Sequence, residues 1–138
     1  MSDSTLLTFS KRPPIHVGHV HTASMLDAVN VSQFGKELDA FVQEHDSVNL
    51  LLDFEGVHYL SSAVLSELLN AQERCEATGG GLRLCSVDPE IKKVFEISNL
   101  DQVFVLYDCA VAEGVKRYTK SLDIERDDET WGHATERL

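Results

Sequence analysis

The sequence predicts a single α/β domain, in which a mixed sheet of four to five strands carries helices mainly on one face. Strand and helix patterns alternate after residue 15, which implies parallel strands joined by right-handed crossovers. Residues 48–54 (VNLLLDF) are almost continuously apolar, as is typical of a strand buried on both faces. At 138 residues, of which 43% are apolar, the chain can bury one core without disulfides or metal.

The first half of the chain predicts two strands, a helix and the buried strand. Residues 6–9 indicate an edge strand stopped by Pro13-Pro14, and residues 15–21 a second strand. Asn30 resembles a helix N-cap, because Gln33 stands where a capping box requires it. The helix that follows should bury the apolar residues that recur on one of its faces, namely Val31, Phe34, Leu38, Phe41 and Val42.

A second helix should open at Ser61-Ser62 and end at the three glycines 79–81. One of these glycines should adopt the left-handed conformation just beyond the helix. A strand is predicted over residues 82–87. Asp88-Pro89 then predicts a helix start, with Asp as N-cap and Pro at the first helical position.

The last predicted elements are a strand over residues 103–106 and a helix that Asp108 caps and that runs to about Tyr118. The domain is therefore expected to span residues 1–119. Residues 120–138 are acidic and carry one aromatic side chain, Trp131. We expect them to form a mobile tail, with docking through Trp131 as the alternative.

The composition restricts the classes of partner. A net charge of −11 without any Lys/Arg run argues against nucleic acid, and no apolar run approaches the ~20 residues that span a bilayer. The first residues contain no apolar signal core, so a cytoplasmic location is expected. The acidity favours a basic protein surface as partner, although it serves solubility equally well. Three widely spaced cysteines without a C-x-x-C motif, at positions 75, 85 and 109, predict neither a zinc site nor a disulfide framework.

The most informative segment is residues 50–71 (LLLDFEGVHYLSSAVLSELLNA), where a buried strand leads through a short loop to two hydroxyls. The N-terminus of a helix exposes unpaired N–H groups and partial positive charge, and therefore accepts phosphate readily. If Ser61 is the N-cap, its oxygen bonds the N–H of Val64. Ser62 is then free to accept a phosphoryl group. By itself, such a pair is most often a simple cap.

Residues 50–118 resemble the STAS family of anti-sigma-factor antagonists. The resemblance is carried by LLLDFEGVHYLSSAVLSEL and by GGGLRLCSVDPEIKKVFEISNLDQVFVLYD, which match the family's linked motifs in order. It implies a non-enzymatic partner-switching module that binds an anti-sigma factor, itself a serine kinase. Phosphorylation ends the contact, and a metal-dependent phosphatase restores it. The family's phospho-acceptor falls on Ser62, with Ser61 as second choice.

The resemblance also implies which residues meet the partner. Asp27 precedes the first helix, where family members often carry an acidic residue near the binding surface, and it otherwise reads as a turn residue. The expected partner-binding set is Asp27, Asn30, Leu60, Ser61, Ser62, Ala63 and Ser66.

The chain departs from the family pattern near the serines. When the family motif is aligned on the serine pair, Leu60 stands in place of the acidic residue before the pair and Ala63 in place of the Gly after it. In the later motif, Ser98-Asn99-Leu100 stands in place of Ser-Gly-Leu. These changes leave the fold intact but bear on phosphorylation. The alternative function is therefore an unphosphorylated scaffold subunit of a signalling complex, or the STAS component of a lipid-transport ATPase complex.

Other candidates for chemistry are weaker. His16, His19 and His21 lie close together, but solvent-facing histidines near a sheet edge explain them better than a metal site does. Asp53 could orient the backbone of the serine loop or act as a structural cap. No G-x-S-x-G elbow and no phosphate-binding glycine pattern is present. We therefore expect no enzyme activity, metal or cofactor, and a homodimer remains compatible with the sequence.

Overall fold

The computed structural model describes residues 6–21 and 28–136, with the side chains of residues 6–21 and 30–123. Five strands form one sheet in the order β1-β2-β3-β4-β5. Only β1 and β2 pair antiparallel, and the other neighbours are parallel. The strands are β1 (Leu7–Arg12), β2 (Ile15–Val20), β3 (Asn49–Asp53), β4 (Gly81–Cys85) and β5 (Val105–Tyr107). The predicted mixed sheet, with the first strand at its edge, is confirmed.

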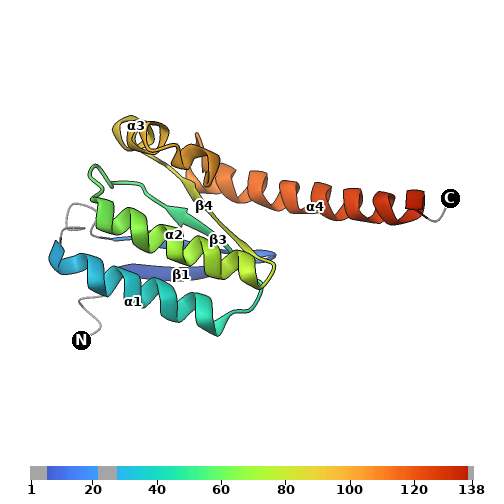
Figure 1. The fold of residues 1–138 in the computed structure, drawn as a ribbon, viewed down its shortest axis with the longest axis horizontal. Coiled ribbons are helices and arrows are strands. Elements are labelled where there is room, and N and C mark those ends of the chain that lie inside the picture. The colour runs from blue at the N-terminus through green and yellow to red at the C-terminus, as the bar shows by residue number, and fades with distance from the viewer. Residues whose placement is uncertain (1–5, 22–27, 137–138) are drawn as a thin grey trace.

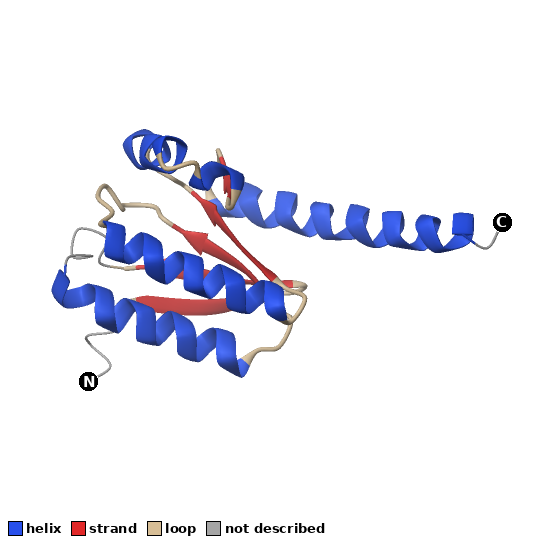
Figure 2. Cartoon of the chain, viewed as in Figure 1, coloured by secondary structure: helices blue, strands red, loops and turns tan. Residues whose placement is uncertain are grey.

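The helices lie mainly on one face of the sheet, as predicted (Figures 1 and 2). On that face α1 packs beside α2, and α3 closes one end. The fourth helix, α4, packs across β2 and β3 on the opposite face. Their bounds are Ala28–Glu44 for α1, Ser62–Ala77 for α2, Pro89–Ile97 for α3 and Val111–Glu136 for α4, with a short 3₁₀ helix at Leu100–Gln102.

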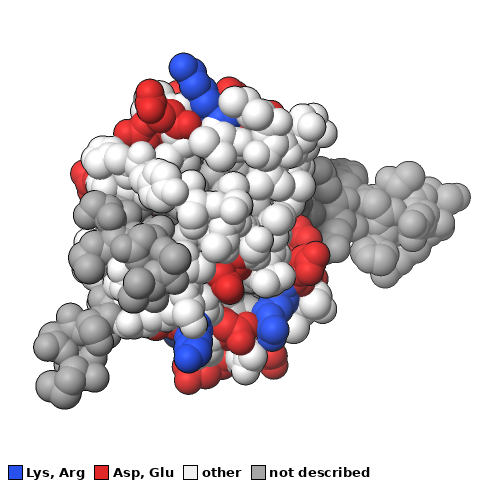
Figure 3. Space-filling model, turned by 60° about the vertical axis from the view of Figure 1, so that its left-hand side comes forward, with Lys and Arg blue, Asp and Glu red and all other residues white. Residues whose placement is uncertain are grey.

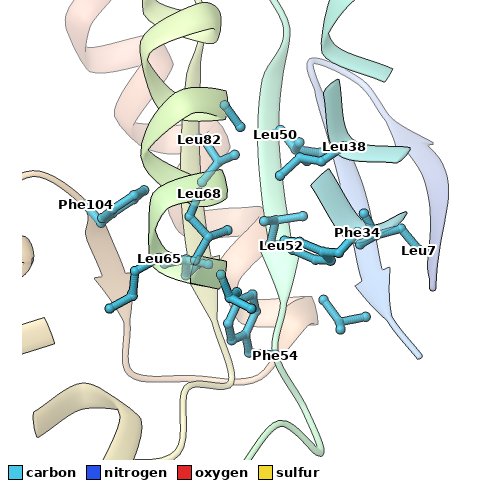
Figure 4. Close-up of a cluster of buried hydrophobic side chains, with 14 of the residues drawn as sticks. Leu7, Phe34, Leu38, Leu50, Leu52, Phe54, Leu65, Leu68, Leu82 and Phe104 are labelled. Carbon is cyan, nitrogen blue, oxygen red and sulfur yellow. The ribbon is translucent and has the colours of Figure 1, made fainter. Parts of the chain in front are cut away.

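The central strand β3 is buried on both faces, because alternate residues enter two different clusters. Leu50 and Leu52 point into the larger cluster beneath α1 and α2 (Figure 4). Leu51 points to the other face, against α4. The α4 face allows a close approach at Gly114, where an added Cβ would lie 3.2 Å from Leu51 Cδ2 and 3.2 Å from Cys85 Cβ. The absence of a side chain at Gly114 thus lets α4 pack close to the sheet.

The predicted helix ends are confirmed at α2 and α3. Gly79 adopts φ +91°, and the N–H groups of Gly79 and Gly80 donate to the carbonyls of Glu76 (3.1 Å) and Cys75 (2.8 Å). This is the Schellman arrangement. Asp88 caps α3, with Pro at the first helical turn.

The start of α1 and the end of β4 differ from prediction. α1 begins at Ala28, so Asn30 lies inside its first turn and is not the N-cap. The Gln33 amide, expected in a capping box, donates to Glu37 Oε2 at 2.7 Å. β4 ends at Cys85, two residues early, because Ser86 adopts φ 56° and leaves the strand.

The last strand is β5 at Val105–Tyr107, and the predicted range 103–106 is therefore shifted. Asn99 takes the left-handed conformation at φ 60° and opens the 3₁₀ helix. The N–H groups of Val103 and Phe104 then donate to the Leu100 carbonyl. These hydrogen bonds close a turn, so residues 103 and 104 do not pair with β4, and Phe104 packs in the core.

The final helix is longer than predicted. α4 continues past Tyr118 to Glu136 and projects beyond the sheet (Figure 1). From Val115 to Trp131 the sequence contains neither Gly nor Pro, so nothing in it forces the helix to stop. The mobility of residues 120–138 and the docking of Trp131 remain predictions.

Candidate functional site

The candidate site is the turn from β3 into α2, where the two serines have different roles. Ser61 has extended backbone angles (φ −86°, ψ 162°), and its Oγ accepts a hydrogen bond from Val64 N at 3.2 Å. Ser62 is the first residue of α2 and is exposed. Its Oγ makes no hydrogen bond to any described residue, while its carbonyl accepts one from Ser66 Oγ at 3.2 Å. The cap therefore occupies one hydroxyl and leaves the other free, as predicted.

The start of α2 is firmly anchored. Val64 is fully buried, and Leu65 is 9% exposed in the core beside the sheet. No acidic residue occurs in the first turn, so the partial positive charge of the helix N-terminus is not neutralised from within the helix. A group attached to Ser62 would thus sit beside unpaired N–H groups on a fixed support.

The loop before the serines is tied down at its beginning by Asp53. This residue is 5% exposed and binds in two directions. Its Oδ1 accepts from Glu55 N at 3.1 Å, and its Oδ2 lies 3.0 Å from His19 Nδ1 on the neighbouring strand. Asp53 therefore serves as a structural cap that also orients the loop.

A second tie joins this loop to α3. His58 Nδ1 lies 2.9 Å from Asp88 Oδ2, while Asp88 Oδ1 accepts from Glu90 N at 2.8 Å. The hydrogen bond from His58, followed by the one from Glu90 N, lowers the pKa of Asp88. The side chain that caps α3 thus also holds the loop in front of α2.

The expected partner-binding residues do not all face solvent. Ser62, Ala63 and Ser66 are exposed, and Ser61 is half-buried. Leu60 is only 9% exposed and belongs to the main core, so its side chain contributes more to packing than to the surface.

The remaining two expected residues belong to the region before and at the start of α1. Asn30 is half-buried in the first turn of α1, which begins at the same end of the molecule as α2 (Figure 1). Asp27 lies outside the described residues.

The missing acid of the family motif does not weaken the helix start. Ser61 occupies the N-cap position, where Asp and Ser are about equally favourable. Leu60, which stands at the family's acidic position, takes no part in this cap and packs in the core.

The other chemical candidates have structural roles. His16 packs edge-on against Phe41 and His45, at centroid distances of 5.3 and 4.9 Å. Burial, followed by the charges of His45 and Lys11, lowers the pKa of His16. His21 instead contacts Thr8 Oγ1. Within residues 6–21 and 28–136, no group of three His, Cys, Asp or Glu side chains is arranged to hold a metal ion.

The cysteines are free thiols that behave as small hydrophobic residues. Burial raises the pKa of Cys75 to about 11 and that of Cys85 to about 12. Cys109 is half-buried, and burial also raises the pKa of its thiol. Because only the thiolate is a good nucleophile, this environment disfavours cysteine chemistry at neutral pH.

Tyr59 is the exposed residue that the sequence analysis missed. Its side chain is 61% exposed, two positions before the N-cap. The signal in the sequence was the pair His58-Tyr59 between the apolar residues Val57 and Leu60. That pattern gave no means of telling which of the four residues would face solvent.

The segment that carries the serines contains no charged residue, although the exposed Glu55 precedes it and Asp88 contacts its His58. Residues 56–66 (GVHYLSSAVLS) contain no Lys, Arg, Asp or Glu. Figure 3 shows this end of the molecule, where the charged side chains lie around the margins and leave a broad uncharged area between them. The net charge of −11 is therefore not concentrated at the candidate site.

Comparison with protein families identifies the fold. The family model described as "STAS domain" matches residues 10–113. The chain belongs to the STAS domain family. The match ends shortly after α4 begins, so the projecting part of α4 lies outside it.

Named relatives of this STAS domain include BtrV of Bordetella bronchiseptica, assigned by name to the anti-sigma factor antagonists. It is 31% identical over 80 residues, which cover 58% of this chain and 68% of BtrV. A STAS domain protein of Planctomyces limnophilus superposes with a TM-score of 0.73 at 22% identity, covering 82% of this chain and 97% of the other.

The STAS domain also resembles SpoIIAA of Bacillus in both of its forms. The unphosphorylated form gives a TM-score of 0.69 at 20% identity, over 83% of this chain and 96% of SpoIIAA. The phosphorylated form gives a TM-score of 0.63 at 20% identity, over 80% and 97%. In the part of this chain that the structure covers, no helix combines the length and the apolar character needed to cross a bilayer.

Proposed function

We propose that this STAS domain is an anti-sigma-factor antagonist. It binds an anti-sigma factor through the start of α2 and does so without catalysing a reaction. Phosphorylation of Ser62 by that anti-sigma factor, acting as a serine kinase, ends the contact. BtrV, at 31% identity, bears the name of this class, and SpoIIAA exists in a phosphorylated form. The proposal places the protein in the cytoplasm, with the sigma factor whose release it controls.

One observation carries the proposal: Ser62 presents a free, exposed hydroxyl at the N-terminus of α2 while Ser61 holds the cap. A kinase can reach this hydroxyl without unfolding the helix. The helix N-terminus stabilises the added phosphate, so the modified chain keeps its fold.

The effect of the phosphate falls on the partner. A phosphoryl group adds about −1.5 to −2 charges at neutral pH. The surface that receives it contains no charged residue between positions 56 and 66. A partner that fits the unmodified surface must then desolvate a dianion. If this lowers the binding free energy by about 3 kcal/mol, the complex becomes roughly a hundredfold weaker.

The test uses the purified anti-sigma-factor serine kinases encoded in the source genome, each incubated with the full chain and Mg-ATP. Intact-mass measurement should show the gain of one phosphoryl group in the wild type and none in Ser62→Ala. Ser66→Ala is the matched control, because Ser66 is an exposed hydroxyl one turn further along α2. It should be phosphorylated like the wild type.

Binding is measured in parallel by calorimetry without ATP. Wild type and Ser62→Ala should bind the same kinase, and Ser62→Asp should bind at least tenfold more weakly. Binding without any phosphorylation would refute the switch and favour the scaffold alternative. Absence of both, across all the kinases tested, would refute the proposed function.

A further inference from the structure

We propose that Tyr59 anchors the partner, with its ring inserted into an uncharged, apolar pocket on the anti-sigma factor. This inference rests on the proposed function and adds to it the chemistry of the surface that the partner must present.

The exposure of Tyr59 is unusual within this chain. Among the residues whose side chains are described, four large apolar residues are strongly exposed. Ile97, Val103 and Val105 belong to the segment from α3 to β5. Tyr59 alone of the four adjoins the serine pair. An aromatic ring that is 61% exposed next to the candidate site is the largest apolar area that this site offers to a partner.

The loop holds the backbone on both sides of Tyr59 in place, while its side chain is exposed. Val57 on one side is fully buried, and Leu60 on the other is 9% exposed. Val57 N donates to the Phe54 carbonyl at 2.9 Å, and His58 is held by Asp88. Because the backbone on both sides of Tyr59 is fixed, little backbone entropy is lost when the ring is bound.

Tyr is among the residues most enriched at interface hot spots, since its large area moves about few torsions. The neighbouring exposed positions, Ser62, Ala63 and Ser66, are small and would surround such an anchor with near-neutral contacts. This arrangement matches the usual anatomy of an interface, in which a few buried residues, often aromatic, carry most of the binding energy and near-neutral contacts surround them.

The absence of charge specifies the partner surface. Residues 56–66 contain no charged side chain, so the part of the partner that covers the Tyr59 ring and the serines needs no basic residue. The acidic side chains next to this segment are Glu55, which precedes it, and Asp88, which contacts His58. Figure 3 shows the charged side chains displaced to the margins of this end of the molecule. The charge-steered contact with a basic surface, expected from the net charge, is therefore replaced here by apolar contact with weak salt dependence.

An apolar pocket also accounts for the effect of the phosphate. The serines follow Tyr59 by two and three positions, so a phosphate on Ser62 lies at the edge of the pocket that holds the ring. In an uncharged interface, an added dianion disrupts binding through its desolvation cost.

The experiment measures the affinity of the full chain for the anti-sigma-factor kinase that binds the wild type in the test above. Tyr59→Ala should weaken binding at least tenfold, whereas Tyr59→Phe should stay within about threefold because the ring carries the contact. Ile97→Ala is the matched control, since Ile97 is more exposed (82%) but lies at the end of α3. It should bind like the wild type. Raising NaCl from 50 to 300 mM should change the wild-type affinity less than about threefold.

The outcomes separate the two proposals. Equal binding by wild type and Tyr59→Ala would overturn the anchor while leaving the proposed function standing, as would a tenfold or larger loss of wild-type affinity on adding salt. A wild type that binds none of the kinases would overturn both. Thermal melting of Tyr59→Ala, expected within a few degrees of the wild type, excludes misfolding as the cause of lost binding.

Discussion

Replacing each of the two adjacent serines of the α2 turn by Ala should change the stability of the fold by different amounts. Ser61→Ala removes the oxygen that accepts from Val64 N at 3.2 Å. Loss of an N-cap oxygen costs about 1 kcal/mol, within a range of about 0.5–2. Ser62→Ala removes a hydroxyl that bonds no described residue, and Ala is a slightly better helix former than Ser. Its free energy of unfolding should change by less than about 0.5 kcal/mol.

The structure favours a stability loss of at least about 1 kcal/mol for Ser61→Ala. Val64 is fully buried, so fraying of the first turn would disturb core contacts as well as the cap. For a chain of 138 residues, a loss of about 1 kcal/mol lowers the melting temperature by roughly 3 to 5 °C. Ser61→Asp provides the rescue, because Asp is an equally good N-cap, and it should restore the stability to within about 0.5 kcal/mol of the wild type.

Urea unfolding followed by far-UV circular dichroism measures these differences directly. The midpoint should fall for Ser61→Ala at an unchanged slope, since the surface exposed on unfolding is the same. If Ser62→Ala lost as much stability as Ser61→Ala, or if Ser61→Ala were neutral, the assignment of the two hydroxyls would be wrong. The proposed phospho-acceptor would then lose its structural basis.

Two further predictions concern packing and pH. Gly80→Ala should destabilise the fold by at least about 2 kcal/mol in urea unfolding, because an added Cβ would overlap the Val48 carbonyl. A Gly80→Ala variant as stable as the wild type would contradict this close approach. Burial lowers the pKa of His16 in the folded state. Below about pH 6.5, His16 therefore binds more protons in the unfolded chain than in the folded chain, and the stability of the fold decreases as the pH falls. His16→Phe should therefore lose less stability between pH 7.5 and 5.5 than the wild type, and an identical pH dependence would exclude His16 as a contributor.

Much of the fold was predictable because local patterns agreed with the tertiary structure. The apolar run in β3 predicted burial on both faces, and Leu50 and Leu51 do enter opposite clusters. Cap signals were reliable at Ser61 and Asp88, where a short side chain has a nearby backbone donor. They failed at Asn30, because helix start signals compete over neighbouring positions and the chosen start lay two residues inside α1.

The strand ends were less predictable, because each depends on a backbone conformation that the residue type does not dictate. Ser86 leaves β4 in the left-handed region, although Ser seldom adopts it. Val103 has high strand propensity, yet its N–H closes a turn onto the Leu100 carbonyl. In both places tertiary packing overrides local preference.

The sequence by itself determined the class of fold, the order of its elements and the position of the serine pair at the start of a helix. Those features follow from periodicity and capping, which act over a few residues. Only the tertiary structure decided which side chains of the loop face solvent, burying Leu60 and exposing Tyr59. It also decided that the charged side chains lie around the margins of this end of the molecule. These properties depend on which distant elements pack against the loop, and a sequence read locally contains no measure of that.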